Sequence, residues 1–468
     1  MGTSAAAPAP FASAVSLRAA LLAGEVTAVE VAAHFLERIA AREDLGAFVS
    51  VTNESALDAA RAADAALATA RSAPTPATPP LLGIPLAHKD LVDVAGAPTS
   101  SGSATQQARI AEDDHPVVAA LRAAGSISLG KTQVPEFGLS CYSENLIASP
   151  ARNPFDRDRT PGGSSGGAAA AVAAGLLPFA PGSDGGGSVR IPALACGLVG
   201  LKPGLGAVPG DVTRGYEDSF GSPILTVSGP LARSAADAAM LMDAMATPNM
   251  RGAHREAVHR AADLTGLTVA TSTASPFEAA LDVPLSDDAL RAFTVAAERL
   301  ALLGHHVDAA EFNYDPEYFE FFSTGWTASL SLLDFDEAQA ERLMPLTREM
   351  RERALGRSLT EHRAAGARLR EFGRDVRGQW GNTDIVLTPG LAMAAPRIGE
   401  FAALPPQQDY ELQCKWTPFT SMVNVAGLPA ITIPMFTDGD GLPVGVQLIG
   451  RAGSEPQLLA IAAQLEAF

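Results

Sequence analysis

Cysteine and positive charge are both scarce in this sequence. Its 468 residues include only Cys141, Cys196 and Cys414, and none of them forms a CxxC or Cys/His pattern. A disulfide framework and a zinc site are therefore excluded, and a reducing compartment such as the cytoplasm is expected. Lys and Arg total 34 against 52 Asp and Glu, a formal net charge of −18. This balance argues against a nucleic-acid surface and against docking on anionic lipid.

A long hydrophobic run is also missing. The longest apolar stretch, residues 166–182, is mostly Ala and Gly and contains Pro178 and Pro181. A bilayer span needs about 20 strongly apolar residues, so no membrane segment is predicted. The first cationic residue is Arg18, so no basic segment precedes an apolar run and no signal peptide is predicted.

The hydrophobic content, 47% of the residues, is sufficient for a large core. Helical periodicity dominates residues 15–70 and 285–379, whereas the following short apolar runs predict strands: 83–87, 127–129, 198–201, 384–387, 430–433 and 444–449. Strands interleaved with helices indicate an α/β fold with a mixed, twisted central sheet covered by helices on both faces. We expect one compact unit with a disordered terminus (1–10), N-terminal helices packed on the core (11–80) and a principal domain (81–468).

One short motif matches the phosphate-binding loop of nucleotide-binding proteins. Residues 125–132 read GSISLGKT, but that loop needs a strand before its first Gly and a helix at its Lys-Thr. Residues 116–124 are expected to form a helix, and the strand falls inside the motif at residues 127–129. We therefore predict helix, turn and strand here, and keep a nucleotide-binding protein only as the alternative from a different functional class.

A second short motif, GGSSG at residues 162–166, matches the nucleophile elbow of Ser-His-Asp hydrolases. A polar, proline-bounded loop precedes it instead of a strand. The histidines that follow it lie in polar or helical sequence and are expected to be solvated: His254, His259, His305, His306 and His362. A Ser-His-Asp triad is therefore not predicted.

The whole glycine-rich region supports a third interpretation. Residues 162–167 read GGSSGG, an Ala-rich helix is expected next, residues 182–192 read GSDGGGSVRIP, and residues 85–90 read PLAHKD. In this order the segments resemble the amidase signature family of serine hydrolases. The resemblance continues at 153–154 (NP), 200–203 (GLKP), 228–233 (SGPLAR), 384–389 (DIVLTP), 424–429 (NVAGLP) and 442–450 (LPVGVQLIG). It covers about residues 15–465, so the principal domain is expected to be an amidase signature domain.

The resemblance implies a Ser-cisSer-Lys triad. It assigns the three catalytic roles to Lys89, Ser164 and Ser188, with a cis peptide bond before Ser164. The main-chain N–H groups of Gly185, Gly186 and Gly187, together with that of Ser188, are then suited to form an oxyanion hole. The remaining residues expected to support the site are Asp184, Arg190 and Ser165. An ion pair or hydrogen-bonded contact between Asp184 and Arg190 is expected to shape the oxyanion loop, with direct substrate contact as the alternative role.

Elementary chemistry is consistent with these roles. A serine hydroxyl is a weak nucleophile without an adjacent base, and Lys89 can act as that base only when it is neutral. Burial among apolar neighbours favours the neutral amine, although Asp90 or Asp93 could instead hold Lys89 charged. A serine between base and nucleophile can relay the proton because a hydroxyl both donates and accepts. His88, beside the base, is expected to pack without a catalytic role.

The predicted activity is amide hydrolysis through a seryl acyl-enzyme, with ester and carbamate (urethane) bonds as further substrates. The triple glycine at 185–187 resembles the branch that contains 6-aminohexanoate cyclic-dimer hydrolase. An enzyme like the ammonia-generating subunit of the tRNA-dependent amidotransferase stays open as an alternative. We expect a small-molecule amide substrate, no cofactor, no metal, no nucleic acid and no membrane partner, with a homodimer left open.

The substrate pocket is expected in the variable helical part of the chain. Its candidate apolar walls are Phe319, Phe321, Phe322, Trp326 and Trp416, for each of which an ordinary core position is an equal alternative. Cys141 and Cys196 are expected to be packed thiols and not nucleophiles.

Overall fold

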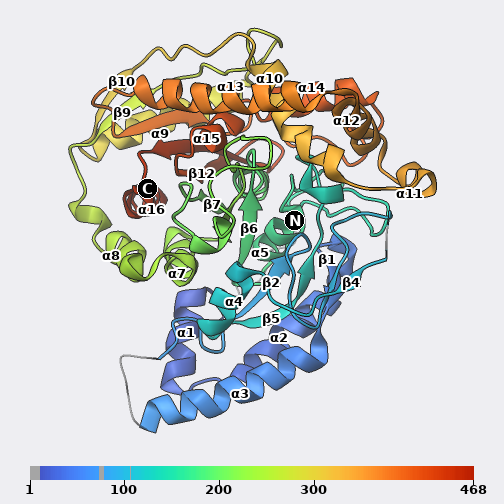
Figure 1. Ribbon diagram of the computed structural model, residues 1–468. Coiled ribbons are helices and arrows are strands. Elements are labelled where there is room, and N and C mark those ends of the chain that lie inside the picture. Colours follow the sequence, from blue (N-terminus) through green and yellow to red (C-terminus); the bar gives the residue numbers. More distant parts are fainter. Residues whose placement is uncertain (1–10, 73–77, 106) are drawn as a thin grey trace.

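The computed structural model describes residues 11–72, 78–105 and 107–468 (Figure 1). The predicted disordered terminus, residues 1–10, lies outside them. The helices are α1 (Ala14–Ala23), α2 (Ala28–Ala40), α3 (Asn53–Ser72), α4 (Pro116–Ala123), α5 (Gly166–Ala173), α6 (Arg190–Ala195), α7 (Ala235–Met245), α8 (Ala253–His259), α9 (Asp287–Leu302), α10 (Tyr318–Thr327), α11 (Glu337–Glu341), α12 (Pro345–Gly356), α13 (Leu359–Gly378), α14 (Pro406–Trp416), α15 (Ser421–Val425) and α16 (Glu455–Glu466). The strands are β1 (Phe48–Val51), β2 (Pro85–Lys89), β3 (Pro98–Thr99), β4 (Arg109–Ile110), β5 (Ile127–Thr132), β6 (Phe179–Asp184), β7 (Val199–Lys202), β8 (Val227–Ala232), β9 (Thr268–Thr271), β10 (His306–Ala309), β11 (Ile385–Pro389), β12 (Ala430–Thr437) and β13 (Pro443–Gly450).

An eight-stranded sheet forms the centre of the molecule, in the order β10-β9-β11-β13-β12-β7-β8-β6. Its pairs β10–β9 and β9–β11 are parallel, and the remaining pairs are antiparallel. The α/β class and the mixed sheet predicted from the sequence are therefore confirmed. β1 and β10 interrupt two regions that the periodicity predicted as helical.

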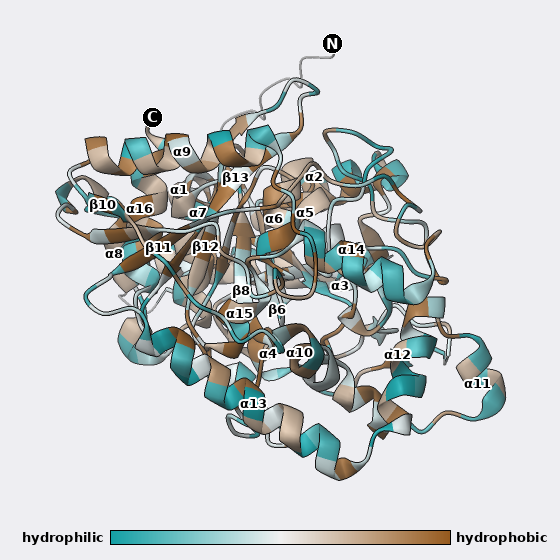
Figure 2. Cartoon of the chain, turned by 90° about the horizontal axis from the view of Figure 1, so that it is seen from above, coloured by the Kyte–Doolittle hydropathy of each residue, from teal (hydrophilic) through white to brown (hydrophobic). Residues whose placement is uncertain are grey.

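Helices cover both faces of this sheet. A side chain at Gly445 of β13 would meet Leu194 of α6, and one at Gly450 would meet Leu458 of α16. Positions an odd number of residues apart in a strand face opposite sides, so α6 and α16 lie on opposite faces. Figure 2 shows apolar strands inside the molecule and, at its edge, helices α9 and α13 with mixed hydrophilic and hydrophobic residues.

A separate three-stranded sheet, in the order β1-β5-β2, adjoins the large one. β2 ends at Lys89, whose Nζ reaches Ser183 in the edge strand β6 of the large sheet. The two sheets therefore meet at the ends of β2 and β6. Each brings polar residues of the predicted active site to this junction.

The N-terminal helices pack on the main body of the protein (Figure 1). Leu17 of α1, Phe35 of α2 and Leu67 of α3 are buried in one hydrophobic cluster with Leu201 of β7 and Leu458 of α16. Among the helices of the described ranges, none has both the length and the apolar character needed to cross a bilayer.

Candidate active site

A cleft of about 320 Å³ lies at the junction of the two sheets. Ser164, Ser183, Gly185 and Ser188 border it. Lys89 lies directly behind two of these serines, because its Nζ is 2.7 Å from the Oγ of Ser164 and 2.9 Å from the carbonyl oxygen of Ser183. The fold thus brings together three residues that are far apart in the sequence, Lys89, Ser164 and Ser188.

The contacts of Lys89 fit a neutral amine. Its Nζ has three partners: the carbonyl oxygen of Ser183 at 2.9 Å, the Oγ of Ser183 at 3.0 Å and the Oγ of Ser164 at 2.7 Å. The carbonyl oxygen can only accept, so it takes one N–H, and the Ser183 hydroxyl oxygen can accept the other. An ammonium would donate to all three oxygens, whereas in the neutral amine the lone pair would face Ser164, whose hydroxyl would then donate to it.

Burial also favours the uncharged form of Lys89. Its side chain is 2% exposed, and this burial lowers its pKa to about 7 against the opposing charge of Asp184. The nearby carboxylates do not pair with it. Asp90 binds Lys131 at 2.9 Å, and Asp93 binds Arg109.

Ser164 follows a cis peptide bond from Gly163 and is buried. The next residue, Ser165, donates its backbone N–H to the carbonyl oxygen of Ser188 at 3.2 Å and its hydroxyl to the carbonyl oxygen of Ser183 at 3.4 Å. Ser165 therefore links the Ser164 segment to the loop that carries Ser188. The Ser188 hydroxyl has no hydrogen-bond partner among the described residues.

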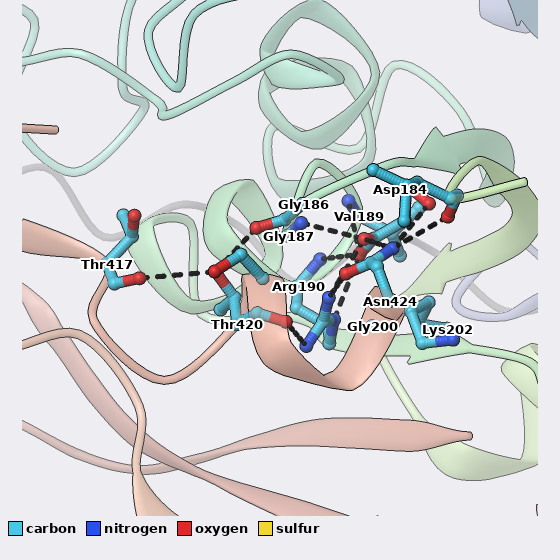
Figure 3. Close-up of polar contacts among 12 residues, drawn as sticks. Asp184, Gly186, Gly187, Val189, Arg190, Gly200, Lys202, Thr417, Thr420 and Asn424 are labelled. Atoms are coloured by element: carbon cyan, nitrogen blue, oxygen red, sulfur yellow. Dashed lines mark hydrogen bonds and ion pairs between the residues drawn. The ribbon is translucent and has the colours of Figure 1, made fainter. Parts of the chain in front are cut away.

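Asp184 and Arg190 form a fully buried, bidentate ion pair behind the glycine loop (Figure 3). The Nε and Nη2 of Arg190 lie 3.0 and 2.9 Å from the carboxylate of Asp184, which also accepts the backbone N–H groups of Gly187 and Val189. The cations Arg190 and Lys202 outweigh the effect of burial and hold the pKa of Asp184 well below its usual range. The carboxylate is therefore ionised and fixes the curve of the loop.

The peptide unit between Gly186 and Gly187 is held at both ends. Its carbonyl oxygen accepts the hydroxyl of Thr420 at 2.6 Å, and its N–H donates to Asp184 at 2.7 Å (Figure 3). Gly187 has a φ of +132°, and a side chain there would meet Thr420 and Ile191 at 2.6 Å. Glycine is therefore required at this position.

The remaining donors of the loop are unoccupied. Within the described residues, the backbone N–H groups of Gly185, Gly186 and Ser188 make no hydrogen bond, whereas that of Gly187 is taken by Asp184. Unpaired N–H groups beside a serine hydroxyl are what an oxyanion hole requires. The predicted donor role of Gly187 does not fit this geometry, because its N–H already donates to Asp184 at 2.7 Å.

Sequence reasoning missed three residues that shape this site. Ser183 binds Lys89, Thr420 holds the carbonyl group of Gly186, and Asn424 donates to the main-chain oxygen of Asp184 at 2.8 Å. Ser183 and Asn424 lie inside segments that carried the family resemblance, which was their only signal. Thr420 lies outside every such segment.

The phosphate-loop motif forms helix, turn and strand, as predicted, with α4 before it and β5 inside it. Its Lys131 is fully buried, 2.9 Å from Asp90 and 3.0 Å from the hydroxyl of Thr99. The ammonium group is thus satisfied by protein groups and does not project from a loop. His88 is buried and its pKa falls to about 3 through burial, so it packs as a neutral ring.

The prediction that the later histidines are solvated is wrong for three of them. His254 is buried against Asp243 at 2.7 Å, His305 binds Gln464 at 3.1 Å, and His362 binds a carbonyl oxygen. Helical sequence with charged neighbours concealed an inward-facing side of these segments. None of the three borders the cleft.

The predicted apolar walls divide into two groups. Trp326 borders the cleft, and Phe322 borders a smaller cavity beside it, whereas Phe319, Phe321 and Trp416 border neither and are buried core residues. The three thiols are free and buried. Over residues 11–72, 78–105 and 107–468 no group of three or more His, Cys, Asp or Glu could hold a metal ion.

Comparison with known proteins gives consistent matches along the chain. A family model described as Amidase matches residues 30–459. The protein AmiB2 of Mycobacterium tuberculosis, whose name assigns it provisionally as an amidase, is 41% identical over 83% of this chain and 82% of its own length. A glutamyl-tRNA(Gln) amidotransferase subunit of Ralstonia nicotianae is 34% identical over 96% of this chain and 95% of its own. The structure of 6-aminohexanoate cyclic dimer hydrolase superposes with a TM-score of 0.84 at 29% identity, covering 98% of this chain and 96% of that one.

Proposed function

Because the chain belongs to the amidase family, as the family model and the relatives show, we propose that it cleaves a carboxylic amide through an acyl-enzyme on Ser188. Its reaction class is amide hydrolysis. The observation that carries the proposed mechanism is the contact between the buried amine of Lys89 and the hydroxyl of Ser164, at the edge of the cleft that Ser188 also borders.

In the proposed reaction Ser164 relays protons between Lys89 and Ser188. The Ser188 hydroxyl gives its proton to the oxygen of Ser164, which passes its own proton to the neutral amine of Lys89. The Ser188 oxygen attacks the carbonyl carbon and forms a tetrahedral oxyanion. When the C–N bond breaks, the leaving nitrogen receives the proton from Lys89 through Ser164. Water then attacks the acyl-enzyme with the same base, releasing the acid and restoring Ser188.

The glycine loop stabilises the oxyanion in this proposal. The unpaired N–H groups of Gly185, Gly186 and Ser188 support that role. Asp184 and Arg190 hold the loop in place, and the engaged N–H of Gly187 helps to fix its curvature. Because these donors are already in position, little rearrangement of the protein is needed when the oxyanion forms.

Esters and carbamates are proposed as further substrates, because the same acyl transfer applies to them. A small-molecule amide, linear or cyclic, is the proposed natural substrate, and the likeness to a cyclic dimer hydrolase supports including cyclic amides. Three free, buried thiols are consistent with the reducing conditions of the cytoplasm, where we place the enzyme.

An ammonia-generating reaction like that of an amidotransferase is the second candidate, supported by the relative from Ralstonia nicotianae. If free glutamine were the donor, its α-carboxylate would call for a cation in the cleft. Among the described residues, the one charged side chain bordering either the cleft or the smaller cavity beside it is the carboxylate of Asp218. This favours an amide other than glutamine.

Hydrolysis of a panel of amides, carbamates, esters and glutamine tests the proposed function. We expect turnover of amides with release of the amine and labelling of Ser188 by a serine-directed phosphonate. Release of ammonia from glutamine, with no turnover of other amides, would favour the second candidate. Absence of both turnover and labelling would contradict the proposal.

A further inference from the structure

Ser188 borders two compartments. The larger is the cleft of about 320 Å³, which Ser164 and Ser183 also border. The smaller, of about 50 Å³, is bordered by Ser188 and Cys414 but by neither of those two serines. Trp326 borders both compartments. The nucleophile of the proposed reaction therefore lies at the boundary between two spaces of unequal size.

The position of the base decides which half of an amide enters each compartment. The two residues that Lys89 contacts, Ser164 and Ser183, both border the larger compartment. A leaving nitrogen must receive its proton through Ser164, so the amine half of the substrate has to face that side. The acyl carbon has one other substituent, which is then directed to the smaller compartment.

The two compartments differ in capacity. The smaller compartment measures about 50 Å³ and the larger about 320 Å³. The larger compartment therefore offers more room for an extended group, and the smaller favours a short one. A short acyl chain with a long amine fits this division better than the reverse arrangement does.

Their chemical character differs as well. The side chains around the smaller compartment include Phe277, Phe322 and the thiol of Cys414, and none of the described residues that border it is Asp, Glu, Lys, Arg or His. Among the described residues that border the larger compartment, only Asp218 is charged. The acyl side is therefore uncharged, and the amine side carries one negative charge.

The carboxylate of Asp218 has one oxygen available for a ligand. Its Oδ1 accepts the backbone N–H groups of Phe220 at 2.8 Å and Ser222 at 2.9 Å. Its Oδ2 makes no hydrogen bond or ion pair within the described residues, and no Lys or Arg borders this compartment. The net charge of −18 attracts cations toward the protein as a whole.

We infer that the preferred substrates are amides of a short, uncharged acyl group with an extended amine that carries a second, protonated amino group, and that Asp218 binds this ammonium. The inference rests on the proposed function, since it uses Ser188 as nucleophile and Ser164 as proton relay. It adds the substrate class and the orientation in which the amide binds.

Two isomeric reversed amides test the orientation with the wild-type enzyme alone. N-(3-aminopropyl)propanamide carries its ammonium on the amine half, and 4-amino-N-ethylbutanamide carries it on the acyl half. We expect kcat/KM to be at least about tenfold higher for the first, because a hydrogen bond to a charged group contributes about that factor. Equal rates or the reverse order would overturn the inference. Hydrolysis of neither isomer by a preparation that cleaves a neutral anilide would also overturn it.

Substitution of Asp218 tests the residue. Asp218→Asn keeps the Oδ1 that anchors the loop and removes the charge. It should lower kcat/KM about tenfold for N-(3-aminopropyl)propanamide and leave the neutral analogue N-butylpropanamide unchanged. The matched control is Glu217→Gln, since Glu217 is the exposed neighbour that pairs with Arg370 and does not border the compartment. An equal loss on both substrates, or an equal effect of both variants, would contradict a role for Asp218 in binding the ammonium.

These results are distinct from a failure of the proposed function. If no anilide is cleaved and a phosphonate does not label Ser188, the acyl-enzyme mechanism itself is wrong. If Ser188 is labelled and anilides are cleaved, the mechanism stands, and the ratio for the two isomers alone decides the orientation.

Discussion

Ser188 is the residue on which the proposed chemistry depends. Ser188→Ala removes the attacking oxygen, and the residue lies in a loop whose shape is fixed by Asp184 and Arg190. We expect turnover and phosphonate labelling to be lost while the unfolding midpoint stays near that of the wild type. Peptide mapping of the labelled protein provides the check. Labelling that persists in the variant and maps to Ser164 or Cys141 would show that the roles are assigned incorrectly.

Thr420 is predicted to act as a positioning residue, because its hydroxyl donates to the carbonyl oxygen of Gly186 at 2.6 Å. Thr420→Val removes that hydrogen bond with little change in volume, and the loop donors lose part of their preorganisation. We expect kcat to fall about tenfold to hundredfold with little change in KM, since small displacements at a reacting centre cost that much.

The control for Thr420 is Thr432→Val, because Thr432 is a buried threonine that donates to the carbonyl oxygen of Gly200 at 3.3 Å. The acidic limb of the pH–rate profile should keep its position in both variants, because neither residue contacts Lys89. A loss of the same size in both, or no loss in Thr420→Val, would leave Thr420 a structural residue only.

At the residue scale, the sequence allowed a prediction wherever a role is tied to a motif. Lys89, Ser164 and Ser188 were assigned from the resemblance, and the structure brings them to one cleft. Thr420 and Asp218 could not be predicted in this way. Thr420 acts on a loop more than two hundred residues earlier, and an aspartate in a polar segment has no sequence signal for facing a cavity.

At the scale of elements, the β2–β5 pair contains a buried ion pair between Lys131 and Asp90. Lys131→Met should leave Asp90 buried without its partner and lower the free energy of unfolding by about 3–5 kcal/mol. The double variant with Asp90→Asn should recover part of this loss. Denaturant unfolding of the wild type, the single variant and the double variant measures these changes. A Lys131→Met protein as stable as the wild type would contradict the prediction.

The same variants test the phosphate-loop alternative. ATP should not bind the wild type in calorimetry, because the ammonium of Lys131 is already held by Asp90 and Thr99. Amide hydrolysis per folded molecule should stay within a small factor of the wild type in the double variant. Binding of ATP that disappears with Lys131 would restore the nucleotide-binding interpretation.

Strands marked by short, mainly apolar runs were predictable, including β2, β7 and β13, which contain proline or glycine. Strands in which proline and glycine are adjacent were not. The predicted runs at 127–129 and 430–433 lie in β5 and β12, and the run at 384–387 begins one residue before β11. β6 and β8 were not predicted as individual strands, because Pro181 pairs with Pro230 and Gly182 with Gly229. Pro181 is tolerated because β6 is an edge strand, and glycine is required at 229 because a side chain there would collide with the backbone of Leu201 at 2.0 Å.

At the scale of the whole molecule, the proposed arrangement is one folding unit that includes the helices of residues 11–80. Leu17 of α1 is fully buried in the same cluster as Leu458 of α16. Leu17→Ala should lower the free energy of unfolding by about 2–5 kcal/mol. All three tryptophans, Trp326, Trp380 and Trp416, lie in the C-terminal half, so their fluorescence reports on distant parts of the structure.

In this variant the midpoint seen by tryptophan fluorescence should fall together with that seen by circular dichroism. A fluorescence midpoint unchanged from the wild type, with an earlier loss of helical signal, would mean that residues 11–80 unfold as a separate unit.

At this scale, the α/β class and the mixed sheet followed from the sequence pattern. The second sheet did not, because its strand β1 lies in a region predicted as helical and the pairing of β2 with β5 depends on packing between distant segments.

The central claim is that neutral Lys89 acts as the base. Its lowered pKa of about 7 sets the pH range in which the activity should change. Below that pH the ammonium form predominates and cannot accept a proton, so kcat/KM for an amide should rise as pH increases through about 7 and then level off. The most direct measurement is the pH–rate profile of the wild type and of Lys89→Ala on a matched amide and activated ester. We predict that the variant loses this limb and at least about a hundredfold of its amide activity. It should lose less on the ester, whose leaving group needs no proton. Equal losses on both substrates with an unchanged limb would contradict the account and make Lys89 a structural residue.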